Sequence, residues 1–378
     1  MMKSIHELLE IAIDQNASDL VIKAGSLPSM RVDGQLQFIG NKNLSAEDAE
    51  DLIHSIIYSS IRDYLLQIGT SASKFSGEEL VEKKANTLRD MEEIDLVFTI
   101  DGLARVRANL FLQRNSVGAA LRIIPLAPLA IEELNLPPIL RDWASQPNGL
   151  VIVTGPTGSG KSTTVAAMAE HINSTRQCHV VTIEDPIEHV FQNKLSIINQ
   201  REVGSDTKSF ASALRAVLRQ TPDVIVIGEM RDAETMRIAI TAGEVGHLVI
   251  TTLHTTSAAA TVDRMLNSFP ADERKQVAAE LAGSLVGISS QRLVLRADGP
   301  GRLPAVEIMT ASPTIKKLIE DLNTGDLYAA IREGQHFGMN TMNQALERLC
   351  QAKAITSDEA ILHTGLNVME LRQMLRRA

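Results

Sequence analysis

Residues 155–162 read Gly-Pro-Thr-Gly-Ser-Gly-Lys-Ser, which fits the phosphate-binding pattern G-x-x-x-x-G-K-[ST]. The apolar run 150–153 comes directly before it, and Val165, Met168 and Ile172 follow at helical spacing. The motif therefore lies at a predicted strand-to-helix turn. Its glycines let backbone N–H groups approach phosphate oxygens, and the N-terminus of the helix adds partial positive charge.

Individual residues of this loop have predicted roles in binding a nucleoside triphosphate. Lys161 can reach the β- and γ-phosphates, and the Ser162 hydroxyl can hold Mg²⁺. The other residues expected to bind the nucleotide are Gly155, Thr157, Gly158, Ser159, Gly160 and Thr163. On its own, the loop is compatible with kinases, GTPases and ATPases.

Three further apolar runs, at residues 180–183, 224–227 and 248–252, alternate with helical patterns and predict a parallel sheet. Each run is followed at once by polar residues. Because ligands bind outside the carboxyl ends of the strands in open α/β sheets, these polar residues are expected to line one crevice with the loop.

The polar residues of this crevice suit phosphoryl transfer from ATP to water. Glu229 ends a Walker-B-like strand and is expected to act on Mg²⁺, directly or through its waters. Either Glu184 or Glu188 can polarise the attacking water, and the pattern does not separate them. His254 is expected to sense the γ-phosphate by hydrogen bonding, whereas His247, the other candidate, fits a structural role better.

Four arginines, Arg105, Arg107, Arg114 and Arg122, lie among strand-like runs near the end of the first 125 residues. Alternation along a strand puts Arg105 and Arg107 on one face. Two interpretations stay open: a solvated surface, or an arginine finger that acts on the γ-phosphoryl group from the same chain or a neighbouring subunit.

The patterns divide the chain into an α+β domain at residues 1–125, a linker at 126–137, a parallel-sheet domain at 138–309 and a helical region at 310–378. The first domain is predicted to begin with a helix at 4–13, capped by Ser4 and Glu7, and to hold an Asp33-Gly34 hairpin turn. Its other predicted elements are strands at 19–22, 94–100, 105–112 and 118–124 and one or two helices at 46–66.

The composition is that of a globular protein, with 44% hydrophobic and 22% charged residues and a formal net charge of −9. This acidic balance argues against a protein that coats nucleic acid. The two cysteines are far apart, which fits a reducing compartment and excludes a zinc ribbon. The chain begins with no signal-peptide pattern and holds no apolar run near the roughly 18 residues of a membrane span, so any membrane role is expected to be peripheral.

Several runs resemble motifs of secretion ATPases. Residues 182–188 are similar to their Asp box, 228–232 to their Walker B motif, and 246–258 to their His box. With residues 17–20 and 31–34, the chain resembles the PilT family of type IV pilus retraction ATPases over nearly its whole length. The resemblance implies an α/β chain with a PAS-like N-terminal α+β domain, a RecA-like P-loop ATPase domain and a helical C-terminal region.

The same resemblance implies roles for individual residues. Lys161 and Ser162 match the residues that hold phosphate and Mg²⁺, with ATP as the nucleotide. The residues that match the family's catalytic positions are Glu188 of the Asp box, Glu229 of Walker B, His254 of the His box, and the N-terminal-domain arginines Arg107 and Arg122. Ser162 and Glu229 are the implied Mg²⁺ residues.

The family further implies a cytoplasmic ring hexamer at the inner face of the cytoplasmic membrane, with nucleotide held between the two domains. Its expected task is ATP-driven disassembly of the pilus into pilins, which powers twitching motility. Its implied partners are an inner-membrane pilus platform protein and related pilus ATPases, with peripheral membrane association through these partners and no nucleic acid. The alternatives are an accessory PilU-like ATPase, a weakly hydrolysing regulatory or docking subunit, and a nucleic-acid translocase, which the acidic composition disfavours.

The sequence departs from the family pattern at two places. Residues 67–88 look like an insertion. Residues 314–318 read Thr-Ile-Lys-Lys-Leu where the family has A-I-R-N-L, so Lys316 replaces an arginine with different hydrogen-bonding geometry. The tetracysteine insertion typical of extension and type II secretion ATPases is missing from the sequence.

Overall fold

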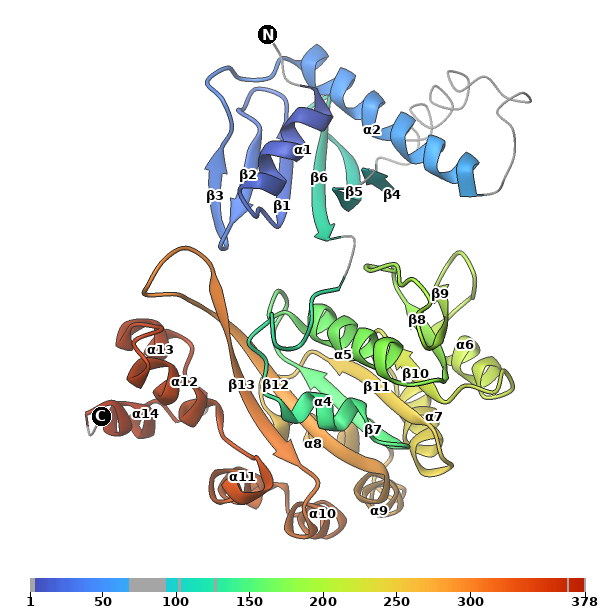
Figure 1. Cartoon of the computed structure of the whole chain (residues 1–378), viewed down its shortest axis with the longest axis vertical. Coiled ribbons are helices and arrows are strands. Elements are labelled where there is room, and N and C mark those ends of the chain that lie inside the picture. The colour runs from blue at the N-terminus through green and yellow to red at the C-terminus, as the bar shows by residue number, and fades with distance from the viewer. Residues whose placement is uncertain (1–3, 68–92, 101–102, 126–127, 366, 377–378) are drawn as a thin grey trace. The chain divides into compact units, whose positions relative to one another are not determined.

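The computed structural model describes residues 4–67, 93–100, 103–125, 128–365 and 367–376. The chain divides into two compact units, residues 1–127 and 128–378 (Figure 1). Apart from Gln67, the insertion expected at residues 67–88 lies outside the described residues.

The first unit is an antiparallel sheet in the order β3-β2-β1-β6-β5-β4, with helices α1 (Ile5–Asp14) and α2 (Ala46–Gln67) against one face. The strands are β1 (Asp19–Lys23), β2 (Ser29–Val32), β3 (Gln35–Phe38), β4 (Glu93–Ile100), β5 (Ala104–Gln113) and β6 (Ser116–Pro125). Alternate residues such as Leu20, Ala108 and Leu121 are buried under the helices, so the other face of each central strand carries the polar residues.

Two local predictions in this unit are confirmed. The Ser4 hydroxyl accepts the Glu7 N–H at 3.2 Å, and the Glu7 carboxylate accepts the Ser4 N–H at 2.7 Å, which is a capping box. Asp33 and Gly34 both have positive φ, 50° and 84°, as a two-residue hairpin turn between β2 and β3 requires.

The second unit holds a seven-stranded sheet in the order β13-β12-β7-β11-β10-β8-β9. Its strands are β7 (Gly149–Thr154), β8 (His179–Glu184), β9 (Ile197–Glu202), β10 (Val224–Ile227), β11 (Leu248–Leu253), β12 (Leu285–Leu295) and β13 (Arg302–Thr310). Neighbours are parallel except β12 and β13. The four predicted strands are confirmed as β7, β8, β10 and β11.

Helices cover both faces of this sheet (Figure 1). On one face lie α4 (Ile139–Ala144) and α5 (Lys161–Thr175); on the other lie α6 (Phe210–Val217), α7 (Ala233–Glu244), α8 (Ala258–Asn267) and α9 (Arg274–Ser284). Because both faces are covered, the central strands are continuous apolar runs, which made them visible in the sequence. The predicted α/β class, with a mostly parallel sheet covered by helices, is confirmed for this unit.

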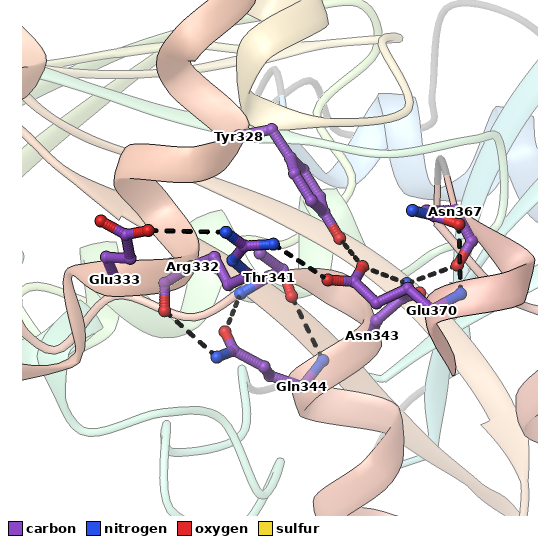
Figure 2. Close-up of polar contacts among 8 residues, drawn as sticks. All are labelled: Tyr328, Arg332, Glu333, Thr341, Asn343, Gln344, Asn367 and Glu370. Carbon is purple, nitrogen blue, oxygen red and sulfur yellow. Dashed lines mark hydrogen bonds and ion pairs between the residues drawn. The ribbon is translucent and has the colours of Figure 1, made fainter. Parts of the chain in front are cut away.

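The chain after β13 forms α10 (Pro313–Glu320), α11 (Leu327–Glu333), α12 (Met342–Gln351), α13 (Ser357–Leu362) and α14 (Val368–Leu375). Helices α12 to α14 share a small core with the ends of β12 and β13. Figure 2 shows the polar cluster that joins them: the Tyr328 hydroxyl donates to Glu370, Asn343 Nδ2 donates to Glu370 at 3.0 Å, and Arg332 lies 3.7 Å from the same carboxylate. Glu370 therefore ties α14 to α11 and α12.

No helix in the described ranges combines the length and the apolar character that crossing a bilayer requires.

One close contact inside the second unit yields a prediction. Gly287 lies on β12, and a Cβ atom there would lie 2.2 Å from the ring of Trp143. Trp143 is the chain's only tryptophan and is buried. Gly287→Ala should therefore lower the free energy of unfolding by about 1–3 kcal/mol through overpacking. Urea unfolding followed by Trp143 fluorescence measures this loss directly.

Gly325→Ala is the matched control, because a Cβ there meets no described atom within 4 Å and φ is not positive. It should shift stability by less than about 0.5 kcal/mol. Equal unfolding midpoints for Gly287→Ala and Gly325→Ala would contradict the packing argument.

Candidate nucleotide site

The loop at residues 155–160 takes a shape that depends on glycine. Gly155, Gly158 and Gly160 have φ values of 144°, 78° and 88°, which side chains rarely adopt. A Cβ on Gly155 would lie 2.4 Å from the carbonyl oxygen of Gln291 on β12 and 2.5 Å from the buried Ser159 hydroxyl. The neighbouring strand therefore leaves room only for glycine at the first position of the loop.

Lys161 is the first residue of α5 and is only 7% exposed. Its ammonium donates to the carbonyl oxygens of Gly155 and Pro156, both at 3.0 Å. Burial lowers the pKa of Lys161, and the nearby carboxylates of Glu229 and Glu188 partly oppose that shift. The structure thus brings three predicted site residues, from the ends of β7, β8 and β10, within electrostatic reach of one another.

Other residues of the loop and of the first turn of α5 are open to solvent. Thr157, Gly158 and Ser162 are exposed, and Thr163 is half-buried in the first turn of α5. The hydroxyl of Ser162 and the carboxylate of Glu229 are hard oxygen ligands of the kind that Mg²⁺ takes when phosphates and water complete its shell. This donor chemistry fits Mg²⁺.

Glu229 follows β10 and has two cationic or polar partners. Its Oε2 lies 3.0 Å from His254 Nε2, and its Oε1 forms an ion pair with Arg231. The carboxylate side chain is 14% exposed, whereas His254 is about half exposed. The predicted residues Glu229 and His254 are therefore in direct contact.

Two threonines hold the loops after β7, β10 and β11 together. The Thr154 hydroxyl accepts the Thr255 N–H at 3.0 Å and lies 2.8 Å from the Thr255 carbonyl oxygen. The Thr252 hydroxyl donates to the Gly228 carbonyl oxygen at 2.6 Å. The segment that carries His254 is thereby fixed to the strand that leads into the phosphate-binding loop.

The structure separates the two glutamates that the pattern left open. Glu184 is half-buried against β9, where it accepts from the Thr182 hydroxyl at 2.6 Å and from Gln200 at 3.2 Å, and desolvation of its carboxylate raises its pKa. Glu188 instead acts electrostatically on Lys161. Glu188 is thus the one placed toward the phosphate-binding loop.

Strand β9, which the sequence did not reveal, positions Glu188. The Ile187 N–H donates to Glu202 at 3.0 Å, and Gln200 donates to the His189 carbonyl oxygen at 2.7 Å. These two hydrogen bonds involve the residues immediately before and after Glu188. The connection between β8 and β9 is therefore fastened to the sheet edge on either side of the glutamate.

Two residues singled out in the sequence lie elsewhere in the second unit. His247 precedes β11 at the amino end of the sheet, where its ring contacts the Ala242 carbonyl oxygen at 3.2 Å, so it does not join the loop. Lys316 on α10 lines a cavity of about 770 Å³ at the amino ends of β7 and β12, together with Trp143 and Glu244.

The arginines belong to the first unit and form part of a row across its sheet. Strand register places Arg31, Asp19, Arg122 and Arg107 side by side on β2, β1, β6 and β5. Asp19 lies 3.7 Å from Arg31 and 3.4 Å from Arg122. The row lies on the face opposite α1 and α2 and carries three positive charges and one negative charge.

Sequence patterns missed several of these residues. Arg231 stood inside the Walker-B-like run but received no role, although a basic residue two positions after an acid can pair with it. Thr154 gave no signal, because a threonine at a strand end is common. Arg31 and Asp19 became visible as neighbours of Arg122 only through strand register.

Comparisons with known proteins give a consistent result. A family profile described as "Type II/IV secretion system protein" matches residues 119–317. The type IV pilus retraction ATPase PilT of Pseudomonas aeruginosa is 42% identical over 94% of this chain and 96% of its own length. The chain belongs to the PilT family of secretion ATPases. The type IV pilus ATPase PilU of the same organism is 36% identical over 98% of this chain and 91% of its own length.

Solved structures of the family agree. The pilus retraction motor PilT with bound ADP superposes with a TM-score of 0.80 at 40% identity, covering 98% of this chain and 99% of that one. The Legionella pneumophila ATPase DotB superposes with a TM-score of 0.79 at 28% identity, covering 95% and 94%. The chain is therefore a P-loop ATPase, and the family resemblance seen in the sequence is confirmed.

The burial of Glu184 yields a prediction about pH. Its pKa in the folded protein is raised above the ordinary 4.5. At pH values between 4.5 and that raised pKa, the folded protein therefore binds a proton that the unfolded chain lacks. Stability should therefore fall as pH rises through that window. Glu184→Gln removes the charge and keeps one oxygen to accept from Thr182 and Gln200, but it loses the second oxygen as an acceptor for the Glu188 N–H. Its stability relative to the wild type should therefore increase from pH 4.5 to pH 7. Urea unfolding across this range measures the difference.

Glu320→Gln, at an exposed position on α10, serves as the control and should follow the wild-type profile. A constant difference between Glu184→Gln and the wild type at every pH would show that this carboxylate does not titrate as described.

Proposed function

We propose that this PilT-family ATPase is a ring-hexameric motor that powers retraction of a type IV pilus by driving pilin disassembly. One observation supports the proposal: the Glu229 carboxylate contacts His254 and acts electrostatically on Lys161 of the phosphate-binding loop, in a chain that is related to PilT over almost its full length. The motor would work in the cytoplasm at the inner face of the cytoplasmic membrane.

The predicted site residues of the second unit each have a role in this proposal. The loop N–H groups and Lys161 bind the phosphates of ATP, and the Ser162 hydroxyl and Glu229 would hold Mg²⁺, which neutralises charge on the β- and γ-oxygens. Glu188 polarises the attacking water. His254 contacts Glu229 and is half exposed, so it can report the γ-phosphate to that carboxylate.

The arginine row supports a role for Arg107 and Arg122 toward the transferred phosphoryl group. These residues lie directly opposite each other on β5 and β6, and like charges in that position destabilise a sheet. Asp19 neutralises only part of the positive charge of Arg107 and Arg122, because its carboxylate is also paired with Arg31. An anionic ligand would balance the remaining charge, as an arginine finger does during phosphoryl transfer.

The expected partners are five further copies of the chain, an inner-membrane pilus platform protein and related pilus ATPases. Nucleic acid is not among them. Membrane association would be peripheral and would occur through these partners.

A second candidate is an accessory role of the PilU kind, with weak hydrolysis and a regulatory or docking task. The observation that favours it is Lys316, which stands where the family has an arginine and which lines a cavity remote from the phosphate-binding loop. Slow turnover in the purified hexamer with tight ATP binding would select this candidate over the principal motor.

Lys161→Ala should reduce ATP turnover on the order of 10²-fold or more, because it removes the charge that stabilises the transferred phosphoryl group. In cells that carry only this variant, we expect surface pili to accumulate and twitching to stop. A phosphate-release assay and electron microscopy of the cells provide the two measurements.

Lys275→Ala, on the exposed surface of α9, should keep wild-type turnover and motility. Glu229→Gln should bind ATP and hydrolyse it slowly. Bald cells would contradict a retraction role, and unchanged hydrolysis in both site variants would contradict the assigned site.

Arg107→Gln and Arg122→Gln should each lower kcat by about 10³-fold, as loss of an arginine finger does. Arg114→Gln removes the same charge from the exposed β5–β6 turn and should leave kcat within a factor of about two. Equal kcat values in all three variants would exclude Arg107 and Arg122 from the site.

A further inference from the structure

Glu307 is a buried acid in the middle of strand β13, between Val306 and Ile308. It is 3% exposed, and each of its carboxylate oxygens accepts a backbone N–H from the first residue of a helix. The Ala258 N–H of α8 donates to Oε1 at 2.7 Å, and the Met342 N–H of α12 donates to Oε2 at 3.2 Å. One side chain thus joins two helix N-termini.

Burying the Glu307 carboxyl group costs free energy, and its hydrogen bonds to the two helices offset that cost. Burial raises the pKa of Glu307, and the two N–H donors and Arg292 oppose only part of that rise. Both helix dipoles direct their positive ends at the carboxylate, which favours its charged form. An apolar residue would suit the surrounding core but would leave two buried N–H groups without an acceptor.

The α8 end of this contact lies close to the nucleotide site. Only Thr255, Thr256 and Ser257 separate Ala258 from His254, and Thr255 is bonded to Thr154. His254 in turn contacts Glu229. The segment that carries His254 is therefore held at its start by the strand of the phosphate-binding loop and at its end by Glu307.

The α12 end is anchored in the C-terminal helices. Asn340 pairs with Ile308 of β13 through two backbone hydrogen bonds, at 2.9 and 3.1 Å. Asn343, the residue after Met342, donates to Glu370 and to the Asn367 carbonyl oxygen (Figure 2). The N-terminus of α12 is thus fixed on both sides of its contact with Glu307.

We propose that Glu307 is a positioning residue for ATP hydrolysis, which holds the N-terminus of α8, and through it His254, in register with Glu229 by anchoring it to α12. The C-terminal helices are then part of the frame of the nucleotide site. This inference rests on the role proposed above for His254.

Glu307→Met, which has similar length and no acceptor, should release the start of α8. Hydrogen exchange of a peptide spanning residues 255–260 should accelerate by about tenfold, which corresponds to the loss of one buried hydrogen bond. The kcat for ATP should fall by a similar factor, with KM changed less than about threefold, because phosphate binding by Lys161 is untouched.

Glu359→Met is the matched control. Glu359 also accepts a backbone N–H, that of Leu295 at 2.7 Å, and it also joins the C-terminal helices to the sheet, but it has no bond to α8. It should leave kcat and exchange at residues 255–260 unchanged. If Glu307→Met does not melt like the wild type, the same measurements are made on Glu307→Gln. The glutamine has one acceptor oxygen and so can accept only one of the two N–H groups.

A double-mutant cycle with His254→Ala decides the mechanism. If Glu307 acts through His254, adding the Glu307 substitution to His254→Ala should lower kcat by less than about twofold further. Full additivity, or unchanged exchange at residues 255–260 in the folded Glu307 variant, overturns this inference alone. Wild-type turnover in His254→Ala by itself overturns both this inference and the proposed role of His254.

Discussion

A buried ammonium is the constraint on which the nucleotide site depends. Burying Lys161 without compensation would cost far more than any single contact returns, and the pKa shift of this lysine records that cost. Two loop carbonyls and the carboxylates of Glu229 and Glu188 supply the compensation. Those acceptors come from three different strands, so the parallel register of β7, β10 and β8 is a condition of the site.

The supporting contacts follow from that condition. Arg231 contacts one oxygen of Glu229 and His254 contacts the other, so these two residues hold the carboxylate that acts on Lys161. Glu202 and Gln200 hold the connection between β8 and β9, which carries Glu188. The site is therefore built from loops whose freedom is removed by side chains of the strands beneath them.

Local signals were enough to predict much of the fold. The capping box at Ser4, the Asp33-Gly34 turn and the apolar runs of β7, β8, β10 and β11 depend on residues close in sequence. The phosphate-binding loop and its flanking strand and helix were predictable for the same reason. The expectation that the polar strand ends lie at one edge of the sheet needed only the rule that parallel strands share their carboxyl end.

Other features depend on pairing between distant segments and gave no such signal. Strands β12 and β13 carry buried polar residues such as Gln291 and Glu307, which mask their apolar pattern. The choice between Glu184 and Glu188 required β9, and the arginine row required the register of four strands. In a single sequence, the residues that make these contacts are far apart, and nothing in the pattern around one of them indicates the other.

Helix α5 connects the nucleotide site to α4. Lys161 and Ser162 are its first two residues, and it runs about 22 Å to Thr175. Beyond its far end, the guanidinium of Arg176 bonds the carbonyl oxygens of Ala144 and Gln146 at the close of α4. A continuous helix therefore links the residues predicted to bind phosphate to the end of α4, which packs beside α5 on the same face of the sheet.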